Sequence, residues 1–266
     1  MRSEATSPEP TAGSREAAAR SPEPPAAGAA AAAAASPEPT RAGTYPMFVG
    51  GRFTRGRSGR THRVGGVTVP LAGPEDVDDA VAAARAALAG WSGATAYHRG
   101  RVLYRVAESL EARAAAFTAI GIRADELRLA VDRWVWYAGW ADKVAQVCGR
   151  THPVAGPYLT VSVPEPVGVV GVAAPSGSRL LGLVSVVAPP VVVGNTAVVL
   201  AAETDPLPAV TLAEVLATSD VPGGVVNILT GRLEPTATLL GSHEGVDALD
   251  LTGVDEPLAA RLESLA

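Results

Sequence analysis

Cysteine, lysine and aromatic residues are all scarce in this 266-residue chain. Cys148 is its one cysteine and Lys143 its one lysine, and aromatic side chains make up 5% of the residues. A single thiol cannot form an internal disulfide, so the cysteine usage gives no sign of an oxidising compartment. The other basic residues are scattered arginines and the net charge is −5, which leaves no cluster of cations for a phosphate backbone. We therefore expect no nucleic-acid partner.

Long apolar runs are lacking as well. The longest stretch, 180–193, is shorter than the roughly 20 apolar residues of a membrane-spanning helix, and Pro189 and Pro190 interrupt it. The N-terminus has no leucine-rich core of a signal peptide. These absences predict a cytoplasmic protein with no membrane segment.

Two common kinds of catalytic site are also missing from the sequence. The four histidines lie far apart, and none stands at the i, i+3 or i, i+4 spacing of a metal-binding pair, so we expect no metal site. Ser176 and Ser178 lie on a strand-to-helix turn, but the G-x-S-x-G pattern of a serine hydrolase is absent. Cys148 follows a helical stretch with no histidine positioned to activate it, which predicts an ordinary buried thiol.

The first 44 residues have the composition of a tail that does not fold by itself. Residues 2–44 contain no Val, Ile, Leu, Phe, Tyr or Trp, so they cannot bury enough apolar surface to offset the entropy of ordering. The sequence "SPEP" occurs three times, at 7–10, 21–24 and 36–39. We predict a disordered Pro/Ala-rich tail over 1–44, acting as a semi-extended tether or as a docking tail, and a folded domain over 45–266.

Helical patterns dominate the first part of the folded domain. Gly50 and Gly51 lie between short β-prone pairs and predict a two-residue hairpin turn. Apolar residues at helical spacing predict helices over 75–90, 96–118 and 123–147. The third helix carries an aromatic stripe, for which a core role is the main interpretation and cofactor stacking the alternative; its members are Trp134, Tyr137 and Trp140.

Short apolar strands alternate with helices from residue 167 onward. The predicted strands are 168–173, 196–200, 225–229 and 248–252, and the predicted helices are 180–188, 207–218, 235–242 and 257–265. Strands that are apolar throughout and separated by helices are typical of a parallel sheet covered on both faces. The sequence therefore predicts the α/β class, with a Rossmann-like parallel sheet, flanking helices and an N-terminal helical segment.

Several strings occur together in an order that resembles the NAD(P)-dependent aldehyde dehydrogenases. They are "FVGGRF", "EDVDDAVAAARAAL", "YAGWADK", "EPVGVVGV", "GNTAVVL", "VPGGVVNILTG" and "LTG". The resemblance covers about residues 47–254. It implies a truncated member of the family, with the N-terminal and NAD-binding portion and a β-hairpin arm, here about 157–167, that pairs subunits.

The resemblance also implies where a cofactor and a reacting carbonyl would lie. The family's Pro-Trp-Asn turn, whose Asn helps to form the oxyanion hole, corresponds to Pro175, Ser176 and Gly177, and Gly177 has no side-chain donor. The family's ribose-binding Lys and Glu correspond to Leu200 and Glu203, so half of that pair remains. A lone carboxylate can bind ribose hydroxyls, which leaves NAD binding weakened and NADP disfavoured.

The last motif of the family is also changed in a way that weakens cofactor binding. Its Phe-Thr-Gly-Ser corresponds to Leu251, Thr252, Gly253 and Val254, so the pyrophosphate-binding hydroxyl is lost. Two acids follow at the start of the next helix, where they favour the helix and occupy the positive pole that a phosphate would use. The residual cofactor-binding residues implied by the resemblance are Pro175, Ser176, Glu203, Thr252 and Gly253.

The resemblance identifies no catalytic residue in the chain. The family's nucleophilic cysteine and general-base glutamate lie beyond its fourth strand, and Cys148 precedes the predicted strands. We therefore expect a pseudoenzyme that is a structural or regulatory partner of a full-length aldehyde dehydrogenase, or of its own copies, in an oligomer. The alternatives are an NAD-dependent aldehyde oxidoreductase and a non-catalytic NAD-binding sensor.

Overall fold

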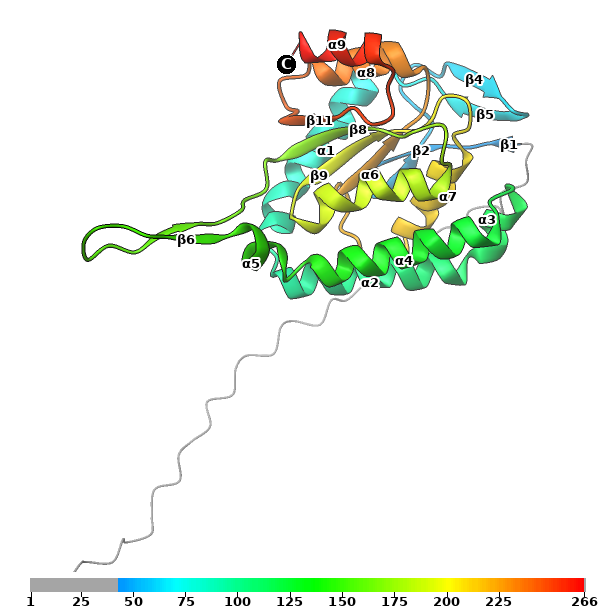
Figure 1. Cartoon of the computed structure of the whole chain (residues 1–266). Coiled ribbons are helices and arrows are strands. Elements are labelled where there is room, and N and C mark those ends of the chain that lie inside the picture. The colour runs from blue at the N-terminus through cyan, green and yellow to red at the C-terminus, as the bar shows by residue number, and fades with distance from the viewer. Residues whose placement is uncertain (1–42, 266) are drawn as a thin grey trace, which may run out of the picture. The chain divides into compact units, whose positions relative to one another are not determined.

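A six-stranded mixed sheet lies at the centre of the structure, a computed structural model that describes residues 43–265 (Figure 1). Its order is β11–β8–β9–β10–β2–β3. The four parallel strands are β8 (Val169–Ala173), β9 (Thr196–Leu200), β10 (Val226–Leu229) and β11 (Ala248–Asp250). The antiparallel hairpin of β2 (Met47–Val49) and β3 (Arg52–Thr54) completes the sheet beside β10. The predicted α/β class is confirmed.

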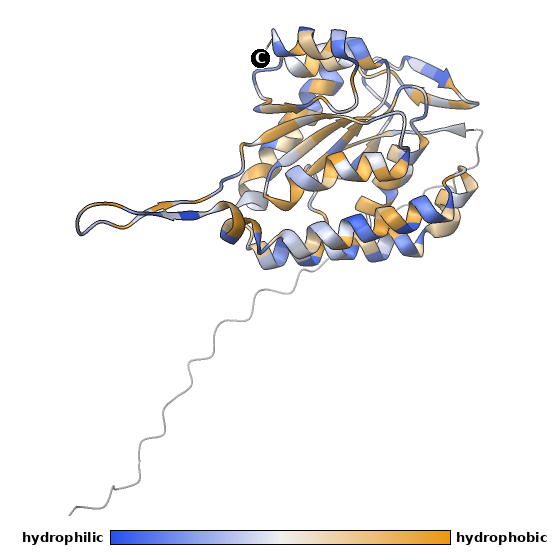
Figure 2. Cartoon of the chain, in the orientation of Figure 1, coloured by the Kyte–Doolittle hydropathy of each residue, from blue (hydrophilic) through white to orange (hydrophobic). Residues whose placement is uncertain are grey.

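Helices cover both faces of this sheet (Figure 1). One face is covered by α1 (Pro74–Ser92), α8 (Leu233–Gly241) and α9 (Glu256–Glu263), which share an apolar core with the strands. The other face is covered by α6 (Leu180–Val192) and α7 (Leu207–Leu216). An outer layer of α2 (Ala96–Ala112), α3 (Ala114–Ala119) and α4 (Ala124–Trp140) packs on α6 and α7. The sheet and α6 are mostly apolar, as expected for buried elements (Figure 2).

Two of the three helices predicted in the N-terminal half are divided, whereas α1 and α6 are longer than predicted. The predicted helix 96–118 divides at Arg113, and the predicted helix 123–147 divides into α4 and α5 (Val144–Cys148). Conversely, α6 continues through Pro189 and Pro190 to Val192 because its last turn is buried in the core. The indole Nε1 of Trp91 donates to the carbonyl of Val191 over 2.9 Å and helps to satisfy that turn.

The predicted hairpin at Gly50 and Gly51 is present, joining β2 to β3. Both glycines have positive φ, 60° and 79°, as a two-residue turn of this hand requires. A Cβ on Gly51 would lie 2.8 Å from the Cα of Gly223, so the turn packs backbone to backbone.

A small sheet of three strands was not predicted. It consists of β1 (Gly43–Thr44), β5 (Val67–Pro70) and β4 (Thr61–Val64). The exposed residues of β4 give it no apolar pattern that would mark a buried strand. Two residues of the predicted tail form β1, and the rest of that tail lies outside the described residues.

A second hairpin projects from the body of the domain (Figure 1). Its strands are β6 (Arg150–His152) and β7 (Thr160–Ser162), which pair with each other. The predicted arm of about 157–167 contains only β7, and from here on we call residues 150–167 the arm. Apolar segments lie along the arm in Figure 2. Its exposed apolar side chains are Val154, Tyr158, Leu159, Val161, Val163 and Val167.

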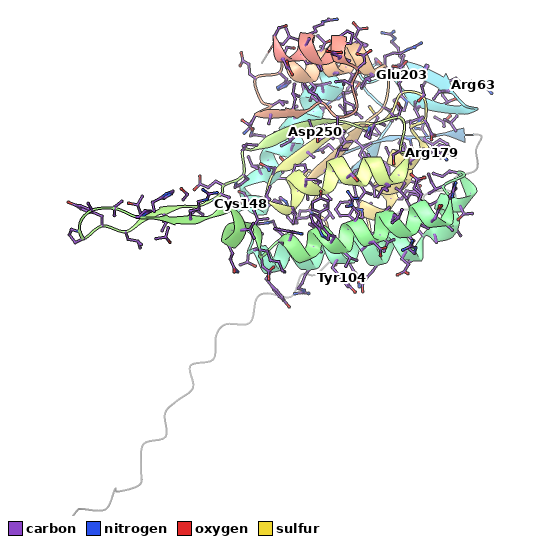
Figure 3. The ribbon with its side chains drawn as sticks, in the orientation of Figure 1. Arg63, Tyr104, Cys148, Arg179, Glu203 and Asp250 are labelled. Carbon is purple, nitrogen blue, oxygen red and sulfur yellow. The ribbon has the colours of Figure 1, made fainter. Side chains whose placement is uncertain are left out.

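Two side-chain predictions near the arm have different outcomes. Trp134 is fully buried, as predicted, whereas Tyr137 and Trp140 are half-buried. The prediction of a buried Cys148 is wrong, because α5 buries none of its residues at the base of the arm and leaves the thiol exposed (Figure 3). Among the described residues, no helix combines the length and apolarity that a membrane crossing requires.

Candidate functional site

The five predicted cofactor-binding residues follow three neighbouring parallel strands. Pro175 and Ser176 follow β8, Glu203 follows β9, and Thr252 and Gly253 follow β11. Because β8 pairs in parallel with β9 and with β11, the carboxyl ends of these strands lie at one edge of the sheet. The structure therefore brings the predicted residues to one edge, where open α/β sheets bind ligands.

The backbone N–H groups at the start of α6, the helix that follows β8, already have hydrogen-bond partners within the chain. The Oε1 atom of Glu126, from α4, accepts from the backbone N–H of Leu180 over 2.7 Å and of Leu181 over 3.2 Å. Ser178 Oγ accepts from the N–H of Gly182 over 3.0 Å. An anion at the start of α6 would have to displace the Glu126 carboxylate.

The turn before this helix offers little for binding. Ser176 and Gly177 are exposed, and an added Cβ on Gly177 would meet no atom within 4 Å. Arg179 is the nearest cation of the turn, but it forms an ion pair with Asp205 and donates to the carbonyl of Gly121 over 2.8 Å. Pro175 and Ser176 thus keep the shape of the turn without a free charged donor.

Glu203 is also engaged by the chain itself. Its Oε2 accepts from the N–H of Leu233 over 2.8 Å at the start of α8, and its Oε1 accepts from Arg232 over 2.8 Å. Burial raises the pKa of Glu203, but these hydrogen bonds and the charge of Arg232 outweigh it and bring the pKa below its usual value. The carboxylate is therefore ionised and already bound at the position where a ribose would meet it.

The start of α9 is likewise capped by a carboxylate of the chain. Asp255 caps α9 by accepting from the N–H of Leu258 over 3.1 Å, and Glu256 adds a second carboxylate to the first turn. Thr252 is exposed, and its N–H donates to Asp250 over 2.9 Å. A Cβ on Gly253 would lie 2.2 Å from the carbonyl oxygen of Ala173, so this glycine allows the loop to pack against the end of β8.

The order of these residues along the chain and their positions after the strands resemble those of a known family, and a family profile shows the membership. The profile of the aldehyde dehydrogenase family matches residues 61–257. The chain belongs to the aldehyde dehydrogenase family. It is 35% identical over 195 residues to the mitochondrial aldehyde dehydrogenase of Homo sapiens, covering 68% of this chain and 37% of that protein. It is 33% identical over 236 residues to the cytosolic 10-formyltetrahydrofolate dehydrogenase of Mus musculus, covering 80% of this chain and 26% of that protein.

Solved aldehyde dehydrogenases share its fold. The NAD+ complex of the aldehyde dehydrogenase from Bacillus cereus has a TM-score of 0.77 at 25% identity, and the match covers 84% of this chain and 49% of that one. The chain thus spans less than half the length of these relatives.

Carboxylates of the chain itself bind the starts of three helices at the carboxyl ends of the parallel strands. A pyrophosphate placed at the starts of α6, α8 or α9 would meet Glu126, Glu203 or Asp255 in place of free N–H groups. The residues that bind these helix starts therefore do not fit a pyrophosphate in the conformation described.

The contribution of Glu126 was missed by sequence reasoning. It lies 54 residues from the helix that it caps, and no local pattern in "RADEL" reports that contact. The pairing of Arg232 with Glu203 was missed for the same reason. No group of three or more metal-ligating side chains occurs in the part of the chain that the structure describes.

Proposed function

We propose that this chain is a non-catalytic member of the aldehyde dehydrogenase family and a structural or regulatory partner of a full-length aldehyde dehydrogenase. The observation that carries the proposal is the binding of internal carboxylates to three helix starts at the cofactor edge. The turn at Gly177 adds to it, because loss of one oxyanion donor costs about 10²–10³ in turnover. The chain therefore retains the fold of the family more fully than the groups that would bind the cofactor and the reacting carbonyl.

The arm supports the partner role. Leu159 and Tyr158 are 81% and 74% exposed, and Val163 is 66% exposed. Neighbouring apolar side chains that face solvent on a projecting hairpin are typical of a protein–protein contact. Among the described residues, β6 and β7 pair only with each other. A partner that covers them would therefore bury apolar side chains and could add backbone hydrogen bonds.

Co-purification tests this role. The full chain would be co-expressed with a full-length aldehyde dehydrogenase from the same organism, and the eluate sized by chromatography with light scattering. We expect the two to elute together, because the apolar arm is buried in the complex. Elution of the 26.9 kDa chain free of the enzyme would contradict the proposal.

Matched variants test whether the arm makes the contact with the full-length enzyme. Leu159→Ser with Val161→Ser removes two exposed apolar side chains of the arm and is expected to reduce recovered complex at least about tenfold, the scale of burying one or two such side chains. The control is Leu129→Ser, an exposed leucine on α4. Equal loss of complex in both variants would assign the contact to a different surface.

NAD sensing is the second candidate function. The observations that favour it are the retained Glu203 and the similarity to a fold solved with NAD+. Fluorescence titration with NADH distinguishes the candidates: we expect no saturation below about 1 mM, since displacing each carboxylate carries a cost. A micromolar constant would favour the sensor. Leu200→Lys should then tighten binding, with Leu200→Met as the uncharged control.

An aldehyde oxidoreductase is the third candidate. The full chain, NAD and acetaldehyde would be mixed and the appearance of NADH followed by absorbance. We expect no NADH above the background, and a Cys148→Ser variant should behave identically, because no hydrogen bond among the described residues joins that exposed thiol to a base. Turnover at ordinary enzyme rates would overturn the non-catalytic role.

A further inference from the structure

Helix α4, in the outer helical layer of Figure 1, carries apolar side chains on its solvent side. Leu129, Trp136 and Trp140 lie at positions i, i+7 and i+11, which places them on one face of the helix. Leu129 is 43% exposed and Trp136 is 53% exposed, whereas Trp134, on the inner face, is fully buried. We call the outer face of residues 129–140 the α4 stripe. Neighbouring apolar side chains that face solvent are typical of an interaction surface.

Trp136, the largest exposed side chain of the α4 stripe, is held in place by its neighbours. Its ring centroid lies 4.8 Å from that of Tyr137 and 5.3 Å from that of Trp140. A ring that is already fixed loses little freedom on binding, and tryptophan is enriched among the residues that dominate the energy of interfaces. Beside it lies a hollow of about 460 Å³ whose lining residues all come from α4. The α4 stripe thus offers both a projecting ring and a space that could receive one.

Two adjacent charges of opposite sign, Asp132 and Arg133, also line this hollow. Asp132 pairs with Arg128 over 3.2 Å, but both side chains are largely exposed, so this pair contributes little to stability. Arg133 donates to the Ser185 hydroxyl over 3.0 Å and forms no ion pair with any residue that the structure describes. Arg133 therefore has donors left for an acid of another molecule.

The order of side chains along the α4 stripe is complementary to its own reverse. In an antiparallel pair of α4 helices with a two-fold axis midway between positions 132 and 133, Leu129 faces Trp136 of the second copy. Asp132 then faces Arg133 of the second copy, and the two-fold axis repeats both contacts in the opposite direction. Each copy thus supplies the acid that Arg133 of the other copy lacks, and each ring meets an apolar side chain.

We propose that the α4 stripe binds the α4 stripe of a second copy of this chain, in an antiparallel pair related by a two-fold axis. The axes of packed helices lie about 8–10 Å apart, which brings these side chains into contact. This self-association goes beyond the proposed partner role and uses no residue of the arm. A contact made mainly by one helix pair is small, so the dimer is weak and reversible.

Analytical ultracentrifugation of the full chain alone tests the surface, with circular dichroism to show that each variant is folded. We expect dimers at about 500 µM protein, since small interfaces give weak association. Trp136→Ser removes a ring from both copies at once, so the dissociation constant should rise at least about 30-fold. The control is Tyr97→Ser, which removes a 72% exposed ring of α2 and should leave the constant unchanged. Monomers alone at that concentration, or equal effects of the two variants, would overturn the proposal.

A charge exchange tests the antiparallel register. Asp132→Arg and Arg133→Asp each bring like charges together across the axis, and each should weaken the dimer at least about fivefold. The double variant re-forms both pairs with reversed signs and should recover most of the affinity. Additive weakening in the double variant would show that positions 132 and 133 do not face each other.

The arm variant, Leu159→Ser with Val161→Ser, separates this contact from the proposed partner role. It should leave self-association unchanged, because the arm lies outside the α4 stripe. Loss of the dimer in the arm variant but not in Trp136→Ser would assign self-association to the arm and overturn the proposal. Since the chain is measured alone, a failure here does not alter the result of co-purification with a full-length enzyme.

Discussion

Asn227 lies in the middle of β10 with its side chain fully buried. Its Oδ1 accepts from the N–H of Gly50 over 2.8 Å, and its Nδ2 donates to the carbonyl of Gly224 over 2.8 Å. Asn227→Ala leaves both groups without that partner, so we expect the free energy of unfolding to fall by about 1–3 kcal/mol. Urea denaturation measures this change. Gln146→Ala, on an exposed side chain, should stay within about 0.5 kcal/mol of the original chain.

The free energy of unfolding is expected to depend on pH through Glu214. This glutamate is 7% exposed on α7, where burial raises its pKa, and the Arg113 guanidinium at 3.4 Å only partly offsets this effect. The folded chain binds the proton more tightly than the unfolded chain, so the stabilisation is complete below the unfolded pKa and is lost as pH rises through the folded one. Glu214→Gln should therefore gain stability relative to the original chain as pH rises.

Urea unfolding at about pH 4 and about pH 7 measures that gain, because the carboxyl changes its charge over this range. Glu111→Gln, on an exposed glutamate, is the control and should show no pH-dependent difference. A gain that is larger at the lower pH would contradict the assignment to Glu214.

At the scale of the element, the cap of α6 is the feature with the clearest test. Glu126→Ala frees the N–H groups of Leu180 and Leu181, which should cost about 1 kcal/mol of stability. The freed helix start should also bind anions, so sulfate is expected to raise the melting temperature of the variant more than that of the original chain. Thermal melts at matched ionic strength measure this, with Glu111→Ala as the control. Equal sulfate effects in all three proteins would show that the helix start was not opened.

Elements with a strong local pattern were predictable from sequence, and those decided by distant contacts were not. The strands β8 and β9 are buried at every position, and their apolar runs predict them to within one residue. The last turn of α6 contradicts its local signal, because burial of Val191 and Val192 outweighs the effect of the two prolines. At the site, the placement of Glu203 followed from the family resemblance, whereas the cap by Glu126 depends on a distant contact that neither the resemblance nor the local pattern indicates.

At the scale of the whole molecule, the core and the arm should differ sharply in mobility. The strands β8, β9 and β10 are buried in the centre of the sheet, whereas β6 and β7 pair only with each other among the described residues. We expect amide hydrogens of the arm to exchange at least about 10³-fold faster than those of the core strands, because local opening needs little free energy there. Hydrogen–deuterium exchange with mass spectrometry measures both regions.

The same measurement in the presence of a full-length aldehyde dehydrogenase follows the proposed assembly. Exchange in the arm should slow at least about tenfold while exchange in β4 and β5 stays unchanged, since only the arm is expected to be covered. An unchanged arm in a complex that forms would place the contact elsewhere.

The arm leaves the body at Gly149 and returns at Gly168. Gly149 ends α5, and Gly168 has φ of +133° with Asp247 so close that an added Cβ would lie 2.0 Å from its Oδ2. A Cβ on Gly149 would lie 2.2 Å from the carbonyl oxygen of Ala145, so both junctions are glycines packed closely against the body. On the proposed role of the arm, we expect that residues 150–167 can be exchanged as a unit. A graft from a different relative should then redirect which subunits assemble while every strand of the central sheet stays in place.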